Sequence, residues 1–124
     1  MLVLGLVAIA AGCHREKVPT EKYFSGQPVA HWVEELKSGN SRARMKAVDV
    51  LGNVGPADPA AIPALTRALK DPDPAVRDAA VLALSKIGAP AAEARPALEE
   101  LTRDPNPTIR GHAVTALDRI VGKS

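Results

Sequence analysis

The side chains most often used in catalysis and metal binding are sparse in this sequence and are not grouped. The three histidines, His14, His31 and His112, lie far apart, and no two have the i,i+4 spacing that places a metal-binding pair on one helix face. The only cysteine is Cys13, so an intrachain disulfide and a cysteine-based metal cluster are both excluded. No serine lies in the Gly-x-Ser-x-Gly context of a hydrolase nucleophile. We therefore predict no catalytic, cofactor-binding or metal-binding residues.

The distribution of charged and aromatic residues argues against acid–base catalysis and nucleic-acid binding. The adjacent carboxylates at 34–35 and 99–100 diverge by about 100° around a helix, so they predict solvated faces rather than an acid–base pair. The 124 residues carry 16 Lys and Arg against 14 Asp and Glu, well mixed, which gives no electrostatic reason to bind nucleic acid. Aromatic residues make up 2% of the chain and all precede residue 33, so a base-stacking surface is excluded from the rest.

One polar residue recurs in a fixed pattern. An arginine appears every 33 residues, and in the second and third copies an aspartate precedes it by six. The planar guanidinium has five donors that can bind carboxylate and carbonyl oxygens together, so we expect a structural ladder; a row of anion-binding sites is the alternative. Ser38 stands at the aspartate position of the first copy, where we expect a gap. The ladder consists of Arg44, Arg77, Arg110, Asp71 and Asp104.

The arginines belong to a longer repeat, which specifies the elements that position them. Segments 44–54, 77–87 and 110–120 align without gaps and share Arg, Ala, Val, Leu and Val or Ile at the same five positions. The spacing of the apolar positions places them on one face of a helix. A lone helical hairpin cannot bury such a face, and about three stacked hairpins are needed for stability. The sequence therefore predicts three stacked copies of one hairpin.

Signals at the helix ends divide each copy into two helices. The N-cap residues of the second helices are Asn40, Asp73 and Asn106. A serine or a proline follows each at the first helical position, and Gly55 and Gly88 end the second helices of the first two copies. No strand is expected. The first helices are expected over approximately residues 28–38, 60–70 and 92–103.

The same register predicts the hydrophobic core. Trp32 aligns with Leu65 and Leu98, so we expect its indole to anchor the first hairpin. The alternative for Trp32 is a partner-binding hot spot together with Tyr23 and Phe24. The predicted core consists of Trp32, Leu36, Val48, Leu51, Leu65, Leu69, Val76, Val81, Leu84, Leu98, Leu101, Val114 and Leu117.

The start of the chain is predicted to be a targeting signal rather than part of the folded domain. Residues 2–11 are uncharged and apolar, and as a helix they would span about half of a bilayer core, which is the length of a signal-peptide apolar region. The run Ile-Ala-Ala-Gly-Cys that ends at Cys13 resembles a bacterial lipoprotein signal. This resemblance implies that residues 1–12 are removed and that Cys13 is lipidated; a short buried helix is the alternative. Residues 13–25 then form a flexible tether.

The repeat itself resembles the short HEAT-like repeat that is also found in phycobilisome lyases. The resemblance is carried by Asp-Pro-Asp-Pro-Ala-Val-Arg-Asp-Ala-Ala-Val-Leu-Ala-Leu-Ser-Lys-Ile-Gly at 71–88 and by the matching segment 104–121. The opening Gln-Pro-Val-Ala-His-Trp at 27–32 is similar to the start of many bacterial repeat arrays. The family implies an all-α fold, a right-handed α-solenoid of three hairpins. The expected repeats cover approximately residues 26–55, 58–88 and 91–122 of a domain at 26–124.

The resemblance implies a protein-binding scaffold rather than an enzyme. Deoxyhypusine hydroxylase, an iron enzyme built from HEAT-like repeats, carries His-Glu pairs as ligands, and this sequence has no His-Glu dipeptide. We expect a lipid-anchored module at the bacterial envelope, without a cofactor, that binds protein partners and not nucleic acid. If the first segment is not a signal, the module is cytoplasmic. Two alternatives stay open: a repeat subunit that cradles the substrate of an enzyme or lyase, and a fragment of a longer array.

The third copy suggests where a partner would bind. No polar capping helix follows it in the sequence, whereas the terminal repeats of a solenoid need a polar outer face. We therefore expect an exposed apolar edge that joins a partner or a second copy of the chain; cover by neighbouring polar side chains is the alternative. The predicted edge residues are Ile109, Val114, Leu117 and Val121.

Overall fold

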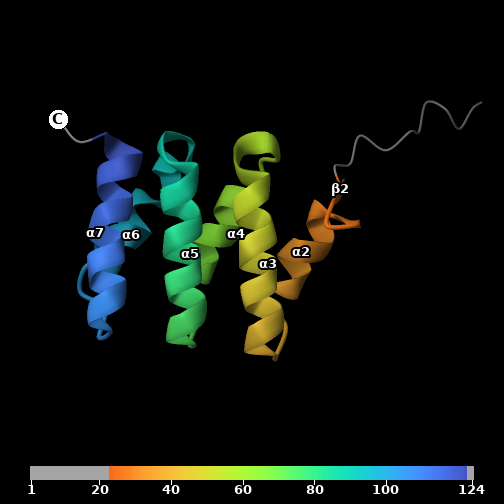
Figure 1. The fold of residues 1–124 in the computed structure, drawn as a ribbon, viewed down its shortest axis with the longest axis horizontal. Coiled ribbons are helices and arrows are strands. Elements are labelled where there is room, and N and C mark those ends of the chain that lie inside the picture. Colours follow the sequence, from red (N-terminus) through yellow and green to blue (C-terminus); the bar gives the residue numbers. More distant parts are fainter. Residues whose placement is uncertain (1–22, 123–124) are drawn as a thin grey trace, which may run out of the picture.

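The structure is a computed structural model that describes residues 23–122. Six α-helices in this part of the chain form three successive pairs, which confirms the predicted all-α solenoid-like fold. The second helices of the pairs stand side by side in one row (Figure 1). The first helices of the second and third pairs lie behind this row in the view, and the first helix of the first pair lies beside the row at its right-hand end. The helices are α2 (Val29–Glu35), α3 (Ser41–Val54), α4 (Ala61–Ala68), α5 (Pro74–Ile87), α6 (Arg95–Leu101) and α7 (Pro107–Val121).

The second helix of each pair begins where the capping signals predict. The side-chain oxygens of Asn40, Asp73 and Asn106 each accept a hydrogen bond from the backbone amide two residues ahead. Gly55 and Gly88 follow α3 and α5 with φ angles of 54° and 76°, a conformation that disfavours residues with a Cβ atom. The end signals therefore act as the sequence analysis expects.

The first helices are shorter than predicted, because each is preceded or followed by tighter turns. A 3₁₀ segment, Gly55–Ala57, leads toward α4, and a longer one, Ala89–Ala94, leads directly into α6. The α-helical part of the third pair's first helix thus begins at Arg95 rather than at residue 92.

The prediction that no strand occurs is wrong at the start of the described chain. Strands β2 (Tyr23–Phe24) and β3 (Gln27–Pro28) pair antiparallel. The turn between them uses Ser25 and Gly26 with positive φ angles, which gives the tight reversal of a two-residue hairpin. The backbone carbonyl of Phe24 accepts a hydrogen bond of 2.9 Å from Trp32 Nε1. Residues 23–25, which were predicted to belong to the flexible tether, therefore form part of the folded domain.

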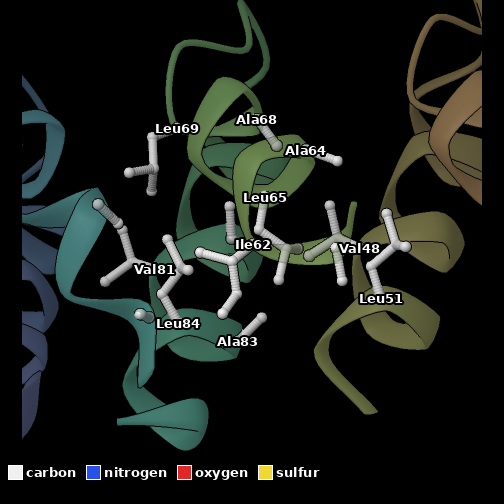
Figure 2. Packing of buried hydrophobic residues seen from close by; sticks show 14 of the residues in the cluster. Val48, Leu51, Ile62, Ala64, Leu65, Ala68, Leu69, Val81, Ala83 and Leu84 are labelled. Atoms are coloured by element: carbon white, nitrogen blue, oxygen red, sulfur yellow. The ribbon is translucent and has the colours of Figure 1, made fainter. Parts of the chain in front are cut away.

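One continuous hydrophobic cluster runs through the three pairs. Ile62 and Leu65 of α4 lie between Val48 and Leu51 of α3 on one side and α5 residues, including Leu84, on the other (Figure 2). The cluster also contains many buried alanines, which the predicted core omits. These small side chains let neighbouring helices approach one another. At the point where α3 passes α5, a Cβ atom added to Gly52 would lie only 3.0 Å from Ala83 Cβ.

Most of the predicted core residues are buried, with three differences. Val114 is 50% exposed, so its assignment to the core is wrong. Leu36 and Leu117 are only partly buried and pack against the margin of the cluster. Val114 and Leu117 follow the register of Val48 and Leu51, but no described residue covers the outer side of α7 as α4 covers α3.

Candidate functional site

Where a following hairpin is present, each repeated arginine binds one carboxylate and also the backbone of its own loop, through one carbonyl for Arg44 and two for Arg77. Arg44 donates from Nε and Nη2 to the two carboxylate oxygens of Asp71, at 2.8 and 3.1 Å. Its Nη1 donates to the backbone carbonyl of Ser38 at 2.7 Å. Arg44 thus joins the loop of its own hairpin to the loop of the next one. The forked geometry gives this contact more directional specificity than a single charge would.

The second pair repeats this arrangement. Arg77 donates from Nε and Nη2 to Asp104 at 2.9 and 3.2 Å, and from Nη1 to the carbonyl of Asp71 at 2.9 Å. Asp104 Oδ1 also accepts from the backbone amide of Asn106, so the carboxylate holds the loop that precedes α7. Burial by itself raises the pKa of Asp104, but its hydrogen bonds to Arg77 and Asn106 and the charges of Arg77 and Arg110 outweigh burial and lower that pKa.

The third arginine keeps only half of this arrangement. Arg110 Nη1 donates to the carbonyls of Asp104 and Pro105, at 2.8 and 3.2 Å. No carboxylate among residues 23–122 accepts from its guanidinium, and Arg110 is exposed, unlike Arg44 and Arg77. The ladder therefore has an open position at Arg110 in addition to the expected gap at Ser38, whose hydroxyl oxygen instead accepts from the amide of Asn40.

The open position lies on an apolar surface of α7. Val114 and Val121 are 50% and 54% exposed, and Leu117 between them is partly buried. Val48 and Val81, which occupy the same register position as Val114, have no exposed area. We call the surface made by Arg110, Val114, Leu117 and Val121 the C-terminal edge.

The prediction that Ile109 belongs to this edge is wrong. Ile109 is 1% exposed and aligns with the fully buried Val76. It lies on the inward face of α7 with Ala113, Ala116 and Ile120, and this face packs against the rest of the array. The helical period therefore separates Ile109 from Val114, although both are aliphatic.

The opposite end of the array differs in character. Trp32 is buried, as its interpretation as a core anchor expects, with the ammonium of Lys46 5.5 Å from the ring centroid. A hollow of about 470 Å³ lies beside it and is lined largely by polar side chains, including His31, Glu35 and Arg42. We call the surface around this hollow, with His31, Glu35 and Arg42, the N-terminal edge; it carries more polar side chains than the C-terminal edge.

The face formed by the second helices carries contacts that the sequence analysis missed. His112 Nδ1 lies 2.7 Å from Asp78 Oδ1 and links α7 to α5, and Lys86 donates to Asn53 and links α5 to α3. Leu82 is 47% exposed on the same face, beside a hollow between α3 and α5. The 33-residue register contains a signal for Leu82, because its counterparts in the other two copies are the polar residues Asp49 and Thr115.

The remaining predicted sites have the following positions. Cys13, the proposed lipidation site, lies outside the described residues, as does His14. Within residues 23–122, no group of three or more His, Cys, Asp or Glu side chains is placed to hold a metal ion. No helix in the described part of the chain combines the length and the apolar character that crossing a membrane requires.

A comparison with known protein families gives a match. A family model described as HEAT repeats matches residues 29–118, which is most of the chain and all three helix pairs. No curated protein matches the chain. The matched region includes the ladder arginines and most of the C-terminal edge, and it excludes Val121 and Cys13.

Proposed function

The chain belongs to the HEAT repeat family, and we propose that it is a scaffold that binds a protein partner through its C-terminal edge. HEAT repeats commonly mediate protein–protein interaction, and their stacked hairpins form extended surfaces for it. We further propose that lipid on Cys13 anchors the scaffold at a bacterial envelope. This anchor is supported by the apolar run and the small residues before Cys13.

One observation carries the choice of surface. Val114 is half exposed, whereas Val48 and Val81, at the same position of the repeat, are completely covered by the hairpin that follows them. Leaving an aliphatic side chain in water forgoes about 1.5–3 kcal/mol relative to full burial, and Leu117 and Val121 extend the same surface. A partner that covers this edge gains the hydrophobic stabilisation that α3 and α5 obtain within the chain.

The test is capture of partners by the full chain in detergent extracts. We expect that the native chain and Leu82→Lys retain the same partner and that Val114→Lys loses it. Leu82 is a matched control because it is about as exposed as Val114 but lies on the second-helix face. Equal capture by all three chains would refute the C-terminal edge as the binding surface, and an absence of any captured protein would refute the scaffold function.

A further inference from the structure

We propose that the C-terminal edge binds a helical hairpin of the partner protein, and that this hairpin carries an aspartate in its interhelical loop and aliphatic side chains on its facing helix. The inference rests on the proposed function and specifies the chemistry of the partner. The partner hairpin would bind α7 as each following hairpin of this chain binds the one before it.

The interfaces inside the chain show what such an edge recognises. Arg44 and Arg77 each use Nε and Nη2 to bind an aspartate that lies 27 residues ahead, in the loop of the next hairpin. Beside the first of these pairs, Ala64 and Ala68 of α4 line a hollow with α2, while Ile62 and Leu65 of α4 lie against Val48 and Leu51 of α3 (Figure 2). The recognition elements are therefore a forked arginine–carboxylate pair and an aliphatic helix face.

The C-terminal edge presents the same elements without their complement. Arg110 already has the carbonyl contact that orients its guanidinium, through Nη1 to the carbonyl of Asp104. Its Nε and Nη2, the atoms that bind carboxylates in Arg44 and Arg77, have no carboxylate acceptor among residues 23–122. Val114 and Leu117 lie next to it with exposed aliphatic surface. A loop aspartate together with an aliphatic helix face complements both parts of this edge.

A second copy of the chain complements the edge poorly. In a head-to-tail arrangement, its N-terminal edge would place Ser38 where Asp71 stands in the internal interface. His31 and Glu35, at the register positions of Ala64 and Ala68, would lie beside α6, because Ala64 and Ala68 face α2 in the internal interface. The missing carboxylate at Ser38 therefore favours a hairpin from a different protein, one that carries an aspartate at this position.

The test adds a fourth hairpin to the C-terminal end of the chain, in the same register as the internal hairpins. A second copy of residues 88–124 is joined after Ile120 of the full chain, so that the copied Asp104 lies 27 residues beyond Arg110, as Asp104 does beyond Arg77. Unfolding of the native and extended chains in urea is measured with and without Arg110→Gln. The matched control is Asp104→Asn in the added copy alone.

We expect Arg110→Gln to lower the folding equilibrium constant less than about threefold in the native chain, where the guanidinium is exposed. In the extended chain we expect a loss of about tenfold or more, since a charged hydrogen-bonded pair is broken. In chains that carry the control substitution, Arg110→Gln should again have the small effect. An equal effect of Arg110→Gln in all three backgrounds would overturn the proposal and would leave the scaffold function itself standing.

Sedimentation of the native full chain tests the choice of occupant. We expect no self-association that depends on Val114. Polymers or dimers that form in the native chain and dissociate in Val114→Lys would identify a second copy as the occupant and overturn the proposed partner hairpin.

Discussion

Replacing Leu84 by alanine tests whether the three hairpins form one cooperative core. Leu84 has no exposed area and lies in the central pair, so neighbouring hairpins surround the space that the substitution creates. The lost transfer free energy of the removed Cγ and its two methyl groups is about 2 kcal/mol, and the residual cavity brings the range for buried leucines to about 2–5 kcal/mol. Because small domains are stabilised by about 5–15 kcal/mol, this is a large fraction of the total.

Leu117→Ala is the matched control for this experiment. Leu117 occupies the same position of the repeat as Leu84 but is only partly buried at the C-terminal edge, so we expect a loss of about 1 kcal/mol. The assay is urea unfolding of the full chain, followed by far-ultraviolet circular dichroism, with a shared slope fitted to both variants. A loss below about 1 kcal/mol for Leu84→Ala, or equal losses for both variants, would show that the central hairpin is not packed as described.

Three further predictions concern the ladder and the anchor. Arg77→Gln should reduce the free energy of unfolding by about 1.5–3 kcal/mol, because it removes the partner of the buried carboxylate of Asp104. The measurement is urea unfolding, and a reduction as small as that of Arg110→Gln would contradict this expectation. Because folding lowers the pKa of Asp104, the stability that its carboxylate contributes should be present above about pH 4, the pKa of an unfolded aspartate, and be lost as the pH falls through the folded pKa. The urea midpoints of the native chain and of Asp104→Asn should therefore converge in acid. A difference between the two midpoints that stays constant with pH would refute the stabilising role of the Asp104 carboxylate. Cys13→Ser should move the protein from the membrane fraction to the soluble fraction or leave an unprocessed precursor, and Ser25→Ala is the control. If the mature native protein is soluble and begins before Cys13, the lipid anchor is refuted.

The repeat register was sufficient to predict the helical pairs, the caps and most of the large core residues. Val48, Val81 and Val114 share one position, and an alignment assigns them one environment. Their exposure differs because burial depends on whether a following hairpin is present, which is a property of the array and not of the repeat.

Two other features depend on contacts that a helical pattern does not encode. The strand pair at residues 23–28 arises from a local turn at Ser25–Gly26 and from the bond between Trp32 Nε1 and the carbonyl of Phe24. The link between His112 and Asp78 joins residues 34 apart, one step off the repeat interval, so an in-register alignment does not bring them together.

Binding of a partner protein at the C-terminal edge can be tested by site-specific photo-cross-linking in cells. The photoreactive residue p-benzoylphenylalanine is placed at Val121, on the rim of the edge, and in a second chain at Leu82, which is similarly exposed on the second-helix face. If the partner binds this edge, a discrete cross-linked protein forms from position 121, is absent from position 82, and disappears when Arg110→Gln and Val114→Lys are added. Cross-linking from position 82 alone, or the same products from both positions, would contradict it.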